Sequence, residues 1–153
     1  MQDFLGKLAR LFSNGDANKA TSADDQVQVA AAALMVHAMR IDDEPHSEER
    51  ARVRVVLQER FEIEAAELDT LIEKGVAEDD EAVDLYRFTK VLTANLDQLG
   101  RQKIVRMLWE VAAADGEIHE FEANLVWRVA ELLGVSREDR IRMRQEVVAA
   151  SMD

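Results

Sequence analysis

A short acidic motif occurs twice in this chain, and its repetition constrains the fold more than any other feature. Each copy follows an apolar run with helical spacing and precedes another such run. The matched positions, all separated by 73 residues, are Asp42 and Asp115, Glu44 and Glu117, His46 and His119, and Glu49 and Glu122. The simplest interpretation is a duplicated helix–acidic turn–helix unit whose two turns face each other across a pseudo-twofold axis.

The composition predicts an all-α protein. The chain has 153 residues with one Pro and six Gly, and it is rich in residues that favour helices. Its length suits a single domain with a proper hydrophobic core, and no segment alternates apolar and polar residues as a half-buried strand does. We therefore expect a compact helical bundle of about seven to eight helices, built from the two duplicated units.

Charge and cysteine content exclude several classes of function. The chain has no cysteine, which rules out disulfides, thiolate catalysis and Cys-based zinc sites. A net charge of −12 disfavours nucleic-acid binding, because binding to the phosphate backbone needs a basic surface. No apolar run approaches the roughly 20 residues of a membrane span, and no signal peptide is recognisable. The predicted location is the cytoplasm.

The chain divides into residues 1–21, an amphipathic segment with a polar linker, and a helical domain over residues 22–153. In the segment 2–13, apolar side chains recur at helical spacing with Lys7 and Arg10 beside them. One interpretation is a helix that contacts a partner protein or the surface of a membrane. The other is a helix folded back on its own domain, or a frayed terminus.

Within the domain, the apolar stripes place each helix, with Ser22, Asp97 and Ser136 as expected N-caps and Gly134 as an expected C-terminal stop. The expected helices span about 22–40, 47–61, 64–76, 78–96, 97–114, 120–133 and 136 to near the C-terminus. The acidic run 78–81 is expected to open its helix, where negative charge favours the positive end of the dipole. The helix near 120–133 is apolar almost all round, including Trp127, which predicts a place at the centre of the bundle.

The second acidic turn resembles part of a calcium-binding EF-hand loop. With Asp115 at loop position 5, Gly116 and Glu122 fall at positions 6 and 12, as that motif requires. Positions 1 and 3 are then Val111 and Ala113, whose side chains cannot coordinate calcium. The turn is not an EF-hand.

Two readings of the acidic turns remain open. If the turns meet, they supply four carboxylates, enough for most of a calcium shell when carbonyls and waters complete it; His46 and His119 could instead favour a transition metal. The alternative is purely structural, since Asp and Gly are ordinary turn residues and an early helical Glu can cap free N–H groups. No nucleophile turn, phosphate-binding loop or zinc-protease motif is present, so we expect no enzymatic activity.

The segment from Leu108 to Glu117, which includes Ala-Asp-Gly-Glu, is followed by Glu122 and then by Leu132-Leu133-Gly134-Val135. This spacing resembles the TerB family, the helical domain associated with tellurite resistance, and is also similar to a domain of some DnaJ-type co-chaperones. The likeness extends over about residues 24–150. The resemblance implies an internally duplicated helical bundle with acidic residues around its two turns.

For that family a metal-chelating role and association with membrane-linked stress-response complexes have been proposed. Carried over by position, the implied ligands are Asp42, Glu49, Asp115 and Glu122, with Glu44 and Glu117 nearby. The resulting hypothesis is a non-enzymatic module that binds a divalent cation, calcium being the first candidate, and acts on a protein partner in stress or tellurite resistance. The alternative is a metal-free scaffold recruited to a membrane or partner by residues 2–13.

Overall fold

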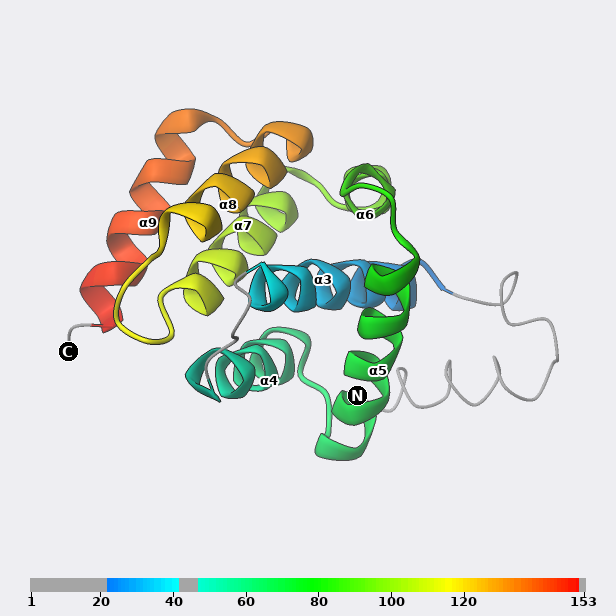
Figure 1. Cartoon of the computed structure of the whole chain (residues 1–153). Coiled ribbons are helices and arrows are strands. Elements are labelled where there is room, and N and C mark those ends of the chain that lie inside the picture. The colour runs from blue at the N-terminus through cyan, green and yellow to red at the C-terminus, as the bar shows by residue number, and fades with distance from the viewer. Residues whose placement is uncertain (1–21, 42–46, 152–153) are drawn as a thin grey trace, which may run out of the picture.

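Seven α-helices and no strand make up the part of the chain that the computed structural model describes, residues 22–41 and 47–151 (Figure 1). They are α3 (Ala23–Arg40), α4 (Ser47–Phe61), α5 (Ala65–Glu81), α6 (Tyr86–Asn95), α7 (Gln98–Ala112), α8 (Glu120–Leu133) and α9 (Arg137–Ser151). The all-α prediction is confirmed. The predicted N-terminal helix and the ligand candidates Asp42, Glu44 and His46 lie outside the described residues.

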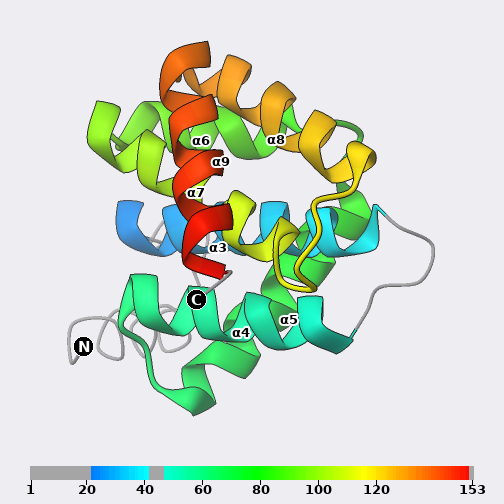
Figure 2. The same cartoon turned by 90° about the vertical axis from the view of Figure 1, so that its left-hand side faces the viewer.

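Helix α3 forms the centre of the bundle. It packs against α4, α5, α6 and α7, with α4 and α5 on one side and α7, α8 and α9 on the other (Figures 1 and 2). The side chains from Ala31 to Val36 are completely buried. Four of its central residues are alanines, and such small side chains let neighbouring helices approach closely. Gly75 of α5 uses this space, since a Cβ there would lie 3.0 Å from the Cβ of Ala32.

The prediction that residues 120–133 form the central helix is wrong. Helix α8 lies in the outer layer, where Phe121 is 70 % exposed and Trp127 is 49 % exposed. Only one face of the helix, which includes Leu125 and Val129, is buried. An apolar residue on the second face of a helix is therefore no proof of burial, because folded proteins keep much apolar surface in contact with water.

The acidic run 78–81 ends α5 and does not open the next helix, contrary to the prediction. This position places four carboxylates at the negative end of a helix dipole. Side chains of α3 offset part of this charge: Arg40 contacts both Asp79 and Asp80, and His37 Nδ1 lies 2.9 Å from Asp79 Oδ1. Tertiary ion pairs thus extend α5 beyond the boundary that local preference favours.

Local capping chemistry was predicted correctly. Gly134 ends α8 with a left-handed φ of 73°, a conformation that favours glycine. The hydroxyl or carboxylate of each capping residue accepts a hydrogen bond from a backbone N–H three residues later. These pairs are Ser22 with Asp25 (3.1 Å), Asp97 with Gly100 (2.8 Å) and Ser136 with Asp139 (3.1 Å).

The arrangement of α3, α4, α7 and α8 positions the candidate site. Helices α3 and α7 pack together in the interior, and the next described helix along the chain after each of them, α4 or α8, lies further out. Contacts between α4 and α7 join the two units, and the C-terminal end of α9 reaches toward α4 (Figure 2). None of the described helices is both long enough and apolar enough to cross a membrane.

Candidate functional site

Glu122 is placed by the first turn of α8, of which it is the third residue. Its Oε1 atom accepts a hydrogen bond from the backbone N–H of His119, 3.4 Å away. The side chain therefore reaches back and caps the start of its own helix, as the structural reading of the sequence proposed. The capping contact uses one carboxyl oxygen and leaves Oε2 for another role.

Glu49 occupies the equivalent place in the first unit, the third residue of α4. Glu49 and Glu122 are each only 1 % exposed, although carboxylates are rarely buried so completely. The charge of Glu49 raises the pKa of Glu122, so the two carboxyl groups are within electrostatic range of each other. The fold thus buries the matching glutamates of both units and couples their charges.

The pKa of Glu122 is raised from 4.5 to about 7. Burial is the largest cause, because a low-dielectric surrounding disfavours the charged form. The negative charge of Glu49 acts in the same direction, whereas the hydrogen bond from His119 lowers the pKa. Oε2 of Glu122 is buried and has no hydrogen-bond partner among the described residues. An ionised Glu122 consequently lacks full compensation in the described part of the chain.

Asp115 and Gly116 shape the second turn. Asp115 Oδ1 accepts a hydrogen bond from the backbone N–H of Glu117 at 3.1 Å, which is an Asx-type turn contact. Gly116 has a φ of 88°, in the left-handed region that glycine enters without steric cost. The turn therefore favours glycine between Asp115 and Glu117. The geometry of the turn holds the Asp115 carboxylate near His119, at the start of α8.

His119 links the turn to the buried glutamate. Its Nε2 atom lies 3.4 Å from Asp115 Oδ2. Burial alone would lower the pKa of this imidazole, but the hydrogen bond and charge of Asp115, with the charges of Glu122 and Glu117, raise it. The protonated form of this imidazole is therefore stabilised relative to that of a free histidine, whereas a transition-metal ligand must be neutral. This environment suits a hard, oxygen-bound cation better than an imidazole-bound metal.

The candidate ligands are only partly assembled in the described structure. The charges of Glu49 and Asp115 both raise the pKa of Glu122. Glu117 is exposed, and its charge raises the pKa of His119. Among residues 22–41 and 47–151, no three acidic or histidine side chains are arranged to hold a metal ion together. A complete oxygen shell would need donors from the first turn, whose residues 42–46 are not described.

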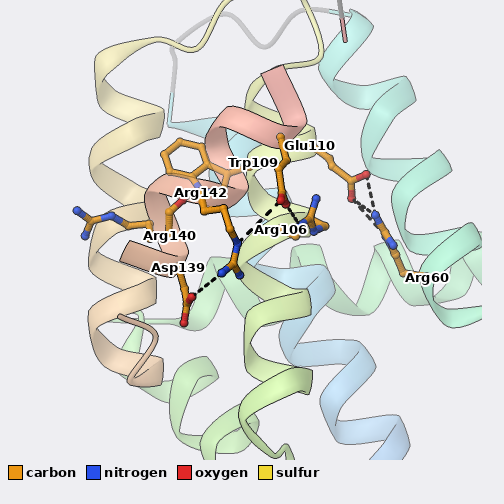
Figure 3. A network of polar contacts seen from close by, with 8 residues as sticks. Arg60, Arg106, Trp109, Glu110, Asp139, Arg140 and Arg142 are labelled. Carbon is orange, nitrogen blue, oxygen red and sulfur yellow. Dashed lines mark hydrogen bonds and ion pairs between the residues drawn. The ribbon is translucent and has the colours of Figure 1, made fainter. Parts of the chain in front are cut away.

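A second polar network, which the sequence did not predict, joins α4, α7 and α9 (Figure 3). Arg60 of α4 binds both carboxylate oxygens of Glu110 on α7, each at 2.9 Å. Arg106 of α7 pairs with Glu146 of α9. Each pair joins different helices, so no short sequence spacing could have revealed it.

Residues 28–145 match the family described as tellurite resistance protein TerB. The chain belongs to the TerB family. This match spans α4, α7 and α8 together with both acidic turns, so the buried glutamate pair lies wholly inside the TerB domain. The resemblance inferred from the motif around Asp115 is confirmed.

Neither the curated proteins nor the solved structures include a significant match to this TerB-family chain. The family therefore supplies a domain type related to tellurite resistance. Any particular activity must be argued from the site itself.

Proposed function

We propose that this TerB-family domain binds a divalent cation between its two acidic turns, with calcium as the first candidate. The domain then acts without catalysis, by presenting a cation-stabilised surface to a protein partner in a tellurite-resistance or related stress response. Glu49, Glu122 and Asp115 contribute oxygen ligands from the described residues. Asp42 and Glu44 of the first turn are the proposed remaining donors, with Glu117 close to the second turn.

The observation that supports this proposal best is the burial of Glu122 within electrostatic range of Glu49. Burial is the largest cause of the raised pKa of Glu122, and repulsion by the charge of Glu49 adds to it. A divalent cation between them would replace repulsion with attraction. It would also use Oε2 of Glu122, which is buried without a hydrogen-bond partner in the described residues.

The chemistry of the donors selects the kind of cation. Carboxylate oxygens are hard ligands that suit Ca²⁺, Mg²⁺ and Mn²⁺. Calcium accepts irregular shells of six to eight oxygens, so it tolerates a site assembled from two separate turns. Magnesium demands a nearly ideal octahedron and retains several waters. We therefore rank calcium above magnesium for a site with this geometry.

Thermal unfolding of the EDTA-stripped protein tests the proposal, with titrations of Ca²⁺, Mg²⁺, Mn²⁺ and Zn²⁺ at fixed ionic strength. A ligand that binds only the folded state adds about 2.7 kcal/mol of stability at a hundredfold excess over Kd. We expect a saturable rise in Tm with calcium. The rise should be lost in Glu122→Gln and Asp115→Asn, each compared with its own metal-free Tm.

Glu120→Gln is the matched control, because Glu120 lies in the same first turn of α8 but is exposed. It removes the same charge from the same region and should keep the full calcium response. If all three variants respond as the wild type does, the acidic turns are capping structures only. The proposal would also be wrong if no cation changed the Tm of the wild type.

The alternative function, a metal-free scaffold recruited through residues 2–13, is separated by a different experiment. Deletion of residues 1–20 should leave the calcium response and the Tm unchanged if the cation site carries the function. Loss of partner or liposome co-sedimentation upon this deletion, with no calcium response in the intact chain, would favour the scaffold.

A further inference from the structure

A groove of about 440 Å³ lies between α4, α7 and α9, near the chain's last described turn. Its charged lining consists of three arginines, Arg52, Arg60 and Arg106, and two glutamates, Glu110 and Glu146. Figure 3 shows Arg60, Arg106 and Glu110 of this lining. The volume falls within the range of about 300–1,000 Å³ that is usual for ligand pockets.

The groove carries a local excess of positive charge. Arg60 is paired with Glu110 and Arg106 with Glu146. Arg52 is exposed, and no ion pair joins it to any other residue in the described ranges. Three guanidinium groups thus face two carboxylates, although the whole chain has a net charge of −12. An anionic ligand is repelled by the chain's overall charge and attracted at this groove.

A carboxylate of an incoming ligand can replace a glutamate in the existing ion pairs. The side chains of Arg60 and Arg106 are each 32 % exposed, and that of Glu146 is 47 % exposed. The Arg106–Glu146 pair is accessible to water and stabilises the fold only slightly, so replacing the Glu146 carboxylate by that of a ligand costs little. A guanidinium group carries five N–H donors and binds carboxylates through two parallel hydrogen bonds.

The apolar part of the lining consists of small side chains. Ala113, Val147 and Ala150 leave room among the arginines for the methylene groups of an acidic side chain. A short peptide can therefore place one or two carboxylates against the guanidinium groups and its aliphatic atoms against these residues. A nucleic acid would instead require an extended basic surface along its backbone.

We propose that this arginine groove binds a short acidic peptide segment of a partner protein. The proposal gives a chemistry to the partner in the proposed function, but it does not depend on the cation. Its test is therefore carried out in EDTA. If no acidic peptide binds, the proposal of a cation site still stands. If calcium does not change the Tm, the proposal for this groove still stands.

Fluorescence anisotropy of a labelled, capped hexaglutamate peptide measures the binding, with hexaglutamine as the uncharged comparison. We expect saturable binding of hexaglutamate that weakens as salt rises. Arg52→Gln should weaken it about tenfold, the usual order for one charge-assisted contact. Arg54→Gln is the matched control, because Arg54 is on the same helix but pairs with Asp69 at 2.7 Å.

Glu146→Gln provides a readout in the opposite direction. It removes a carboxylate that competes for Arg106 and should tighten hexaglutamate binding, a gain that loss of folding cannot imitate. The proposal is overturned if hexaglutamine binds equally well, if Arg52→Gln and Arg54→Gln weaken binding to the same extent, or if Glu146→Gln weakens it. Displacement of the peptide by an equal concentration of inorganic phosphate would also overturn it, since the groove would then be a general anion site.

Discussion

Glu122 and Glu49 are 73 residues apart in the sequence, yet both are almost completely buried and the charge of Glu49 raises the pKa of Glu122. One oxygen of Glu122 caps α8 and the other faces the interior without a hydrogen-bond partner in the described residues. The same residue therefore stabilises a helix start and carries a charge that the fold does not fully compensate. This combination links the protonation of Glu122 to folding stability and, in the proposed function, to cation binding.

The stability of the metal-free protein should depend on the protonation of Glu122. Its pKa is 4.5 when unperturbed and about 7 in the folded state. Between these values the folded state holds a proton that the unfolded state has lost. The free energy of unfolding therefore falls as pH rises across this window, by at most about 1.4 kcal/mol per pH unit. Urea unfolding in EDTA at pH 5, 6, 7 and 8 measures this slope.

Glu122→Gln keeps the shape but removes the charge, so it should flatten this slope and be more stable than the wild type above pH 7. Glu49→Gln removes only the repelling neighbour and should reduce the slope partly, because burial still raises the pKa of Glu122. Equal slopes in the wild type and Glu122→Gln would show that Glu122 is ionised in both states.

Gly75→Ala should destabilise the protein although alanine is the better helix former. A Cβ at this position would lie 3.0 Å from the backbone carbon and Cβ of Ala32, so α3 and α5 would have to move apart. Overpacking of this kind costs about 1–3 kcal/mol, against a gain in helix propensity of about 1 kcal/mol. Thermal denaturation should show a lower Tm for the variant.

The opposite substitution on the same helix is the control for Gly75. Ala77 is exposed, so Ala77→Gly should cost about 1 kcal/mol through propensity alone. A higher Tm for Gly75→Ala than for the wild type would mean that the two helices are not in close contact.

Asp79→Asn should loosen the C-terminal end of α5. The side chain of Asp79 is only 8 % exposed and binds His37 and Arg40 of α3. Asp80 also pairs with Arg40 but is 61 % exposed. We expect a loss of about 1–3 kcal/mol for Asp79→Asn and less than about 1 kcal/mol for Asp80→Asn. Hydrogen exchange of the last turn of α5 should quicken only in the former.

The two tryptophans should report different environments. Trp109 is 2 % exposed and its Nε1 donates to the carbonyl oxygen of Arg140 at 3.2 Å. Trp127 is 49 % exposed, with the guanidinium of Arg140 5.3 Å from its ring centroid. Trp127→Phe, which retains Trp109, should show blue-shifted emission and weak acrylamide quenching. Trp109→Phe should show strong quenching and lose about 1 kcal/mol of stability with its hydrogen bond.

The sequence predicted those features that depend on nearby residues. Helical spacing predicted the all-α class, and the caps at Ser22, Asp97 and Ser136 agree with the structure. The stop at Gly134 is correct for the same reason. In each case the interaction spans a few residues, so the order of amino acids is enough to specify it.

The repeat also determined part of the candidate site. Its constant spacing places Glu49 and Glu122 at the third residue of their helices. The capping contact of Glu122 was one of two readings left open, and it occurs. Burial of both glutamates could not be deduced, because it depends on how α4 and α8 pack against the rest of the bundle.

Only the tertiary structure decided which surfaces are covered. It placed the alanine-rich α3 at the centre, because small side chains permit close packing, and it left Phe121 and Trp127 of α8 on the outside. It extended α5 through an acidic run, because α3 supplies Arg40 and His37 as polar partners for the carboxylates. It also gathered Arg52, Arg60 and Arg106 around one groove. Local hydrogen bonds and periodicity are encoded in neighbouring residues, whereas burial and charge pairing depend on residues that meet only when the helices pack.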